Sequence, residues 1–469
     1  LLQGDDYRQL TETTTGNYGG LGIQIDVRDG WITVVAPLPE TPAERAGIET
    51  GDQIIEVNGK STEGWTNEQA VNALRGEVGS RVAITVRRVG VPAPLRFQLT
   101  RAQIHVRSVP PGTLFEDGIG YVKLSPVSET SASELRSEIS AMLGKGMTAM
   151  ILDLRDNPGG LLDQGVKVAD LFLDPNQEIV ATRGRARGST RRFVDEARQA
   201  WPNLPIVVLV NDGSASAAEI IAGALQDHDR AVIVGTPTFG KGLVQTLYQL
   251  GPDRALKLTT ARWYTPSGRT IQRIARDEEE QARLAAIAAG EAVDSLPVAP
   301  SDTSLAERPV YRTDAGRIVR GGGGIVPDIV VRDTLTPQER AFAAALGGKV
   351  PEYRDVLTAY ALELKNAGTV KSPDFRVTPA MRREVLERLR RKGAQLSDSV
   401  FYGASRLIDE QLGYQIARYV FGRAAEFRRQ AADDEQMRVA MELLRGADTP
   451  KELLGLASAR VDAASAGKD

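Results

Sequence analysis

The residues of this chain with the clearest chemical potential are a serine and a lysine in small-residue surroundings. Ser216 lies in the segment 213–220, directly after an apolar run at 205–210 that is typical of a strand buried on both faces. A serine at the start of a helix faces unpaired backbone N–H groups and the positive end of the helix dipole. That position suits an attacking oxygen and a developing oxyanion. A helix-capping serine is the alternative.

Lys241 occupies a similar place after the next apolar run, 231–234, and lies between Gly240 and Gly242. Burial among apolar neighbours disfavours the ammonium and lowers the pKa of a lysine. A neutral amine can accept the proton of a serine hydroxyl, and Gln245 could orient it. The segment also approaches a phosphate-binding loop pattern, but glycine stands at 242 where serine or threonine would hold magnesium.

A third strand followed by a glycine-rich turn occurs at 153–162, where the N–H groups of Gly159 and Gly160 can donate to an oxyanion. Three such turns at strand ends place their loops on the carboxyl edge of one sheet, where α/β proteins build their sites. A serine nucleophile, a lysine base and glycine donors together indicate a Ser-Lys hydrolase.

Composition excludes several other classes of function. The 469 residues contain 58 basic and 61 acidic side chains, and the resulting net charge of −3 is no footprint for nucleic acid. No apolar run reaches the roughly 20 residues that span a bilayer. The chain has no cysteine and only two histidines, His105 and His228, so thiol catalysis and a three-histidine metal site are excluded.

The texture of the chain changes along its length. The first hundred residues form short β-like runs separated by glycine turns, whereas 113–272 alternates buried strands with helical patterns. The segment 273–310 is charged and alanine-rich, which favours a surface insertion. From 334 to 469 the apolar residues follow helical spacing only. The fold class is therefore multidomain α/β, with a β-rich module, an α/β core and an all-α C-terminal region.

The chemical segments resemble those of the carboxyl-terminal processing proteases, the tail-specific serine endopeptidases of peptidase family S41. The resemblance covers about the first two thirds of the chain and rests on five motifs in order, at 153–162, 213–220, 239–245, 264–272 and 324–328.

The resemblance implies a role for each matching residue. Ser216 is the nucleophile, with Ser214 as its rival, Lys241 is the general base, and Gln245 positions Lys241. The N–H groups of Ala217 and Gly159, with Gly160 adjacent, form the oxyanion hole. Glu219 matches a recurrent acid of the family, to which we assign no catalytic step.

The family places a PDZ domain before the protease core, and the segment 19–23 resembles its carboxylate-binding loop. Successive N–H groups there would hold a terminal carboxylate, while the following strand edge accepts the peptide as an added strand. Arg75 stands where some family members link the PDZ domain to the active site. The residues expected to bind the peptide are Gly20, Leu21, Gly22, Ile23, Val71 and Leu74.

On this basis we expect an N-terminal segment at 1–18 and a PDZ domain at 19–104. A protease core of crotonase-like α/β fold follows at 105–333, with the insertion 273–310, and a helical C-terminal domain spans 334–469. That domain would form a homo-oligomer or bind an adaptor protein.

The partners implied are proteins or peptides with exposed C-termini, and neither nucleic acid, metal nor cofactor is required. The resemblance implies a periplasmic or cell-envelope setting, with a signal or anchor absent from this sequence. For His228 we expect a hydrogen bond at a helix end rather than catalysis, and for the arginine run at 183–192 a solvated loop.

Two other classes of function use similar parts. Crotonase-type acyl-CoA enzymes also direct glycine N–H groups at an acyl oxygen, and a PDZ scaffold with a silent protease core binds without cleaving. The pairing of Ser216 with Lys241 behind a PDZ-like module favours the protease over both.

Overall fold

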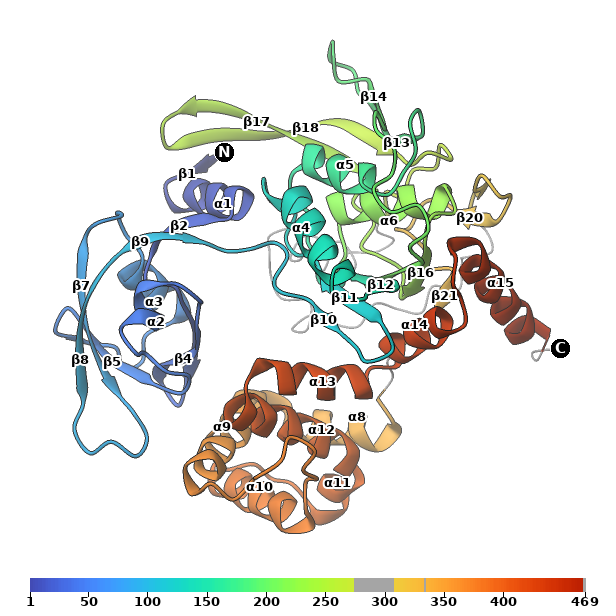
Figure 1. The fold of residues 1–469 in the computed structure, drawn as a ribbon. Coiled ribbons are helices and arrows are strands. Elements are labelled where there is room, and N and C mark those ends of the chain that lie inside the picture. Colours follow the sequence, from blue (N-terminus) through green and yellow to red (C-terminus); the bar gives the residue numbers. More distant parts are fainter. Residues whose placement is uncertain (274–307, 333–334, 467–469) are drawn as a thin grey trace. The chain divides into compact units, whose positions relative to one another are not determined.

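The computed structural model describes residues 1–273, 308–332 and 335–466, which divide into two compact units (Figure 1). The α/β unit consists of residues 1–16 and 106–332 together with the chain from 435 onward. The β/helical unit consists of Asn17–His105 and the chain from 333 to 434. The insertion expected at 273–310 lies almost entirely outside the described residues.

The β-rich module of the β/helical unit is an antiparallel sheet in the order β3-β4-β5-β7-β8, with one main helix, α3. Its hairpin between β5 and β6 turns at Asn58 and Gly59, both with positive φ, as their sequence predicts. Helix α3 begins with a capping box between Thr66 and Gln69, a sequence pattern that favours a helix start. The element bounds are β3 Ile23–Arg28, β4 Trp31–Pro37, α2 Pro42–Arg45, β5 Gln53–Val57, β6 Lys60–Ser61, α3 Asn67–Leu74, β7 Arg81–Arg87 and β8 Leu95–Thr100. 

A short ribbon of strands β2 (Asn17–Gly20) and β9 (Ala102–His105) brackets this module at its two ends. Inside the module, alternate residues of the strands face α2 and α3, and Ile32, Ile54 and Ile84 are almost completely buried there. The period of two in these strands is the reason that one face forms a core while the other stays polar.

The α/β unit is built on a sheet in the order β10-β11-β12-β15-β16-β21, parallel except for β10. Its central strands are near-continuous apolar runs because both faces of the sheet are covered. The bounds are β10 Thr113–Leu114, β11 Ile119–Lys123, β12 Ala149–Asp153, β15 Ile206–Val210, β16 Val232–Gly235 and β21 Ile329–Val330.

Helices α4 (Ser131–Leu143), α5 (Leu162–Asp170) and α6 (Ala217–Asp227) share a core with alternate strand residues such as Leu152 and Val208. The intervening residues, Ile151 and Val207 among them, are equally buried on the opposite face. Helix α14 (Glu435–Arg445) contacts β12, β15 and β16 and covers that face (Figure 1).

A second sheet of the α/β unit follows the order β1-β18-β13-β14, and β17 pairs with the other edge of β18. Strands β17 and β18 form a long ribbon that extends from the unit (Figure 1). The arginine run is exposed, as expected, but only its middle is a loop, because Arg183 ends β13 and Arg191 and Arg192 begin β14. The bounds are β1 Leu2–Gln3, β13 Glu178–Arg183, β14 Arg191–Val194, β17 Leu243–Gly251 and β18 Arg254–Tyr264, with helix α1 at Asp5–Thr15.

The C-terminal part of the chain is helical as expected, but its helices belong to two units. Phe342, Phe401 and Ile408 lie at the centre of an apolar core that the helices of the β/helical unit form. These helices are α8 Pro337–Leu346, α9 Val350–Ala367, α10 Pro379–Arg391, α11 Asp398–Gly403, α12 Ser405–Ile416, the π-helix η4 Ala417–Phe421 and α13 Arg423–Asp433. Helix α14 and helix α15 (Pro450–Ala466) are instead part of the α/β unit, because the second face of its sheet requires a cover.

We predict that Leu444→Ala in α14 destabilises the α/β unit by about 2–5 kcal/mol, because it removes a core side chain that is 3% exposed. Hydrogen exchange should become faster in β12 and β15, which α14 covers. Leu456→Ala in α15 is the control, since Leu456 is 39% exposed and its truncation should cost less than about 0.5 kcal/mol. Equal effects of the two substitutions would contradict this account of α14.

Candidate active site

Three loops meet at the carboxyl edge of the parallel sheet. Strands β12, β15 and β16 are neighbours in this sheet, and each is followed by one of the glycine-rich segments singled out in the sequence. The expectation that these segments share one edge is therefore confirmed. The nucleophile loop (211–216), the glycine loop (154–161) and the lysine loop (236–242) all belong to the α/β unit.

Ser216 is the N-cap of α6 and has φ 54° and ψ −115°, a backbone conformation that non-glycine residues rarely adopt. Strain of this kind clusters at functional sites, where the surrounding structure holds it in place. Ser216 is half-buried, whereas Ser214 is completely buried. The Ser214 hydroxyl donates to the Leu154 carbonyl at 2.8 Å and accepts from the Asn211 N–H at 3.0 Å. The Ser214 hydroxyl is therefore buried and held by hydrogen bonds within the fold, whereas Ser216 is partly accessible to solvent.

The glycine loop lies directly against Ser216. A Cβ atom at Gly159 would fall 2.8 Å from the Ser216 Cβ and 2.6 Å from the Ala215 carbonyl oxygen, so only glycine fits there. Asn157 joins the loops as well, because its carbonyl accepts from the Ala215 N–H at 2.9 Å. The structure therefore brings Gly159 and Ser216 together.

The oxyanion donors differ in their availability. The Gly159 N–H donates to the Asn157 side-chain oxygen at 2.9 Å and is already engaged. In the described part of the chain, the N–H groups of Ala217 and Gly160 donate to no acceptor. Gly160 has φ 149°, and a Cβ atom there would collide with the Val127 carbonyl. Ala217 and Gly160 are therefore the better-prepared pair of donors.

One buried carboxylate joins the nucleophile loop to the lysine loop. Glu219 is completely buried, and its two oxygens accept four hydrogen bonds. The donors are the Ser216 N–H at 2.8 Å, the Gly240 N–H at 2.7 Å, the Lys241 N–H at 2.9 Å and the Thr238 hydroxyl at 2.6 Å. Burial raises the pKa of Glu219, and the hydrogen bonds that it accepts oppose that rise.

The backbone of Lys241 is fixed at both its N–H and its carbonyl. Its N–H donates to Glu219, and its carbonyl accepts from the Trp263 indole at 3.0 Å. Burial lowers the pKa of the Lys241 ammonium, the nearby Lys257 lowers it further, and the Glu219 charge opposes both effects. Among the described residues, no carboxylate forms an ion pair with the Lys241 ammonium. These conditions favour the neutral form of the amine.

Gln245 is not brought to Lys241. Its side chain is exposed on β17, and it makes no hydrogen bond within the described residues. The register of β17 against β18 shifts between Val244 and Gln245, which redirects the side chains that follow. The predicted orienting contact between Gln245 and Lys241 is therefore missing from this arrangement.

The sequence singled out Glu219 but not its contacts, and it did not single out Thr238. The pattern Ser-x-x-Glu at 216–219 is a capping-box signal, and it could have pointed to the contact between Glu219 and Ser216. Nothing local marks Thr238, whose hydroxyl also accepts from the Ile325 N–H. His228 caps the end of α6 and lies 2.7 Å from the Glu178 carbonyl, as expected of a hydrogen bond at a helix end.

The second predicted site lies on the β-rich module. In the described chain, the N–H groups of Leu21 and Gly22 donate to no acceptor. Gly22 has φ 75°, and its Cα lies against Thr41, so a side chain is excluded. Strand β3 follows this loop as the terminal strand of its sheet, next to α3. A free pair of donors beside a free strand edge suits a terminal carboxylate and the peptide attached to it.

The side chains expected to line a groove between β3 and α3 differ in their burial. Val71 and Ile23 are half-buried, whereas Leu74 is 7% exposed and belongs mainly to the module core. The Arg75 guanidinium lies 4.4 Å from the centre of the Tyr18 ring, and the neighbouring Gly76 N–H donates to the Gly19 carbonyl. Arg75 therefore lies at the carboxylate end of the groove.

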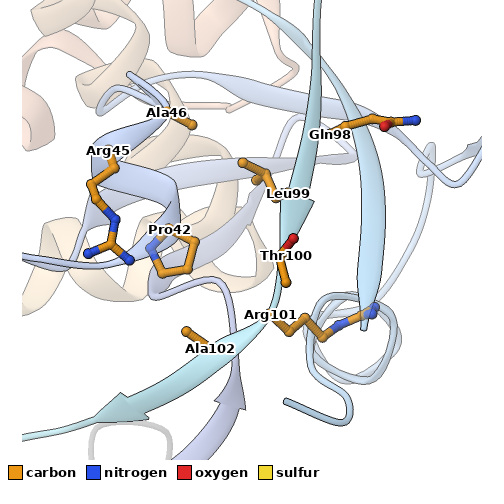
Figure 2. Close-up of a pocket in the computed structure, with 8 residues that line it drawn as sticks. All are labelled: Pro42, Arg45, Ala46, Gln98, Leu99, Thr100, Arg101 and Ala102. Atoms are coloured by element: carbon orange, nitrogen blue, oxygen red, sulfur yellow. The ribbon is translucent and has the colours of Figure 1, made fainter. Parts of the chain in front are cut away.

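Figure 2 shows a pocket of about 490 Å³ elsewhere on the same module, between α2 and the end of β8. The Arg101 guanidinium points away from this pocket and donates to the carbonyls of Ala73 and Leu74 at the end of α3. Arg101 therefore stabilises the end of α3, and no reactive groups converge in the pocket. Its lining residues are Pro42, Arg45, Ala46, Gln98, Leu99, Thr100, Arg101 and Ala102.

Two other kinds of site are absent from the described residues. No group of three or more His, Asp or Glu side chains there is arranged to bind a metal ion. None of the described helices combines the length and the apolar character that crossing a membrane requires.

Two family models match the chain. Residues 118–279 match peptidase family S41, and residues 9–87 match the PDZ domain. The first range contains all three loops of the candidate site. The second contains the predicted carboxylate-binding loop and α3.

Individual proteins give the same picture. A carboxy-terminal-processing protease of Bartonella bacilliformis is 44% identical over 277 residues, which cover 58% of this chain and 63% of that protein. The carboxy-terminal processing protease CtpA of Bacillus subtilis is 37% identical over 266 residues, which cover 57% of this chain and 56% of that protein. The chain thus spans less than two thirds of these relatives.

A solved structure of a photosystem II D1 C-terminal processing protease is also similar in sequence. It is 30% identical, and the match covers 58% of this chain and 74% of that chain with a TM-score of 0.33.

We predict that Glu219→Gln lowers the catalytic rate at least about 100-fold, because an amide cannot accept four hydrogen bonds and the loops shift. Gel-based cleavage of an unfolded protein measures this rate. Glu339→Gln is the matched control, since Glu339 is a buried capping-box glutamate of α8 in the other unit. Equal losses in the two variants would mean that Glu219 acts only as a helix cap.

Proposed function

From a chain that combines a PDZ domain with a peptidase family S41 core, we propose a serine endopeptidase that cleaves proteins recognised by their C-terminal tails. Ser216 is the nucleophile and Lys241 the general base. No cofactor enters the reaction. The observation that carries the proposal is the shared carboxylate of Glu219, which ties the backbone of Ser216 to that of Lys241.

The reaction is an acyl transfer in two steps. The neutral Lys241 amine takes the Ser216 hydroxyl proton while the serine oxygen attacks the scissile carbonyl. The Ala217 N–H, with Gly160 or Gly159 beside it, stabilises the oxyanion. The lysine returns the proton to the leaving amine, and water then hydrolyses the acyl-enzyme. For Gly159 to contribute, its N–H must leave the Asn157 side chain.

Tail recognition rests on the β-rich module. The unpaired N–H groups of Leu21 and Gly22 would bind the terminal carboxylate, and the edge of β3 would pair with the tail as an added strand. The last side chain of the tail would enter the groove between Ile23 and Val71. Gly20 and Leu74 shape the ends of this groove, and Arg75 could link tail binding to the active site.

We retain oligomerisation or adaptor binding as the role of the helices between 335 and 434. Helices α14 and α15 contribute less to such a role, since α14 packs on the sheet of the α/β unit. We also propose a periplasmic or cell-envelope setting, which the family resemblance implies.

We predict that the cleavage rate rises with pH through the lowered pKa of Lys241 and then levels off, because only the neutral amine accepts a proton. Lys257→Gln removes a neighbouring charge that favours the neutral amine, so its profile should move to higher pH. The exposed Lys145→Gln is the control. A profile of kcat/KM that stays flat from about pH 6 to 9 contradicts Lys241 as the base.

We predict that Ser216→Ala abolishes cleavage, with a loss of roughly 10⁴-fold or more. Ser214→Ala should retain activity and lose about 1–3 kcal/mol of stability, because it leaves the Asn211 N–H unpaired. Gel-based degradation of an unfolded protein with an apolar C-terminus compares them. Cleavage that persists in Ser216→Ala makes Ser214 the nucleophile. No cleavage by the unmodified chain favours a binding protein over a protease.

A further inference from the structure

The edge of β3 places alternate side chains of a bound tail on two faces. A strand added to this edge continues the alternation of the sheet, so the last side chain enters the groove beside α3 and the next-to-last faces outward. On β3 itself, Ile23, Ile25 and Val27 pack toward the module core. Gln24, at the carboxylate end of the strand, belongs to the outward set and is exposed.

The outward face of β3 lies against the helices of its own unit. The Arg28 guanidinium donates to the Tyr419 hydroxyl at 3.0 Å and also to the Thr358 hydroxyl. Closer to the carboxylate-binding loop, the Arg423 guanidinium donates to the Gln24 side-chain oxygen at 2.8 Å. Residues from opposite ends of the chain thus meet on the strand that would receive the tail.

An irregular stretch of helix presents these groups. Helix α12 passes into the π-helix η4, which ends at Gly422 with φ 89°, and α13 begins at Arg423. Single π-helical turns are rare and occur often at functional sites. Here the π-helical turn lets both Tyr419 and Arg423 contact β3, although they lie four residues apart and Gly422 interrupts the helix between them.

The positive charge of Arg423 is not matched by a paired carboxylate. Arg28 pairs with Asp26 at 3.2 Å, and Arg418 pairs with Glu426 at 3.6 Å. Within the described residues Arg423 forms no ion pair: the nearby Glu426 carboxylate, which favours its charge, pairs with Arg418, and the Arg423 guanidinium donates instead to the neutral amide of Gln24. The Gln24 amide therefore holds a cation beside the strand edge, and most N–H donors of the Arg423 guanidinium are not used there.

We propose that Arg423 is a specificity-determining residue that favours substrate tails with an acidic side chain at the next-to-last position. Directly opposed residues of paired antiparallel strands have Cβ atoms about 4.5–5.5 Å apart, so an outward side chain opposite Gln24 reaches the guanidinium. An acidic side chain gains an ion pair there, whereas a basic one meets like charge. The inference rests on the proposed tail recognition and adds a preference to it.

The test measures binding of fluorescent decapeptides that end in Asp-Ala, Asn-Ala or Lys-Ala to the full chain carrying Ser216→Ala, which prevents cleavage. We expect the Asp-Ala peptide to bind about three- to fivefold more tightly than the Lys-Ala peptide at low salt. The difference should shrink at high salt. In the Arg423→Gln double variant the discrimination should disappear while the Asn-Ala affinity stays unchanged.

Arg428→Gln in the same helix is the matched control, since Arg428 is exposed and, among the described residues, forms no hydrogen bond or ion pair with β3. It should keep the discrimination. Discrimination that survives Arg423→Gln, or is absent from the starting chain, overturns the inference. A peptide amidated at its C-terminus separates the two proposals: if amidation leaves affinity unchanged, tail recognition itself fails, and the preference fails with it.

Discussion

The candidate site depends on a single desolvated carboxylate. Glu219 has no contact with solvent, so its charge is stabilised only by the four donors that surround it. Three of these donors are backbone groups of two different loops. Losing any one of them leaves part of a buried charge uncompensated, which is costly in a low-dielectric interior. The loops that carry Ser216 and Lys241 are therefore held to one geometry by the same electrostatic requirement.

The same constraint explains two unusual features of the site. The strained backbone of Ser216 persists because its N–H is anchored to Glu219 and Gly159 lies closely against its side chain. Lys241 is anchored through its backbone alone, so its ammonium has no paired anion among the described residues. Burial without a partner lowers the pKa of that amine, which is the property that a general base requires.

In the β/helical unit, side-chain packing supports the free edge of strand β3. An unpaired strand edge is a liability unless it is short, covered or used. Strand β3 keeps its hydrogen-bonding edge free while its outward side chains contact the helices through Arg28 and Gln24. The helices thereby stabilise the strand and leave its hydrogen-bonding edge open.

Much of the fold was predictable because its signals are local. The apolar runs at 205–210 and 231–234 form buried parallel strands, and the helical spacing of apolar residues after 334 corresponds to helices such as α10 and α12. Three loops on one sheet edge follow from strand order alone. Ser216 and Lys241 could be selected for the same reason, since the neighbouring residues show that each follows a strand.

The tertiary structure alone decided the features that depend on distant contacts. The complete burial of Ser214 depends on Leu154, the exposure of Gln245 on a register shift in a ribbon, and the position of α14 on the uncovered face of a sheet. Arg423 and Gln24 are 399 positions apart, and no local pattern pairs them. Sequence periodicity specifies which face of an element is apolar, but the partner of that face is chosen by the packing of the whole chain.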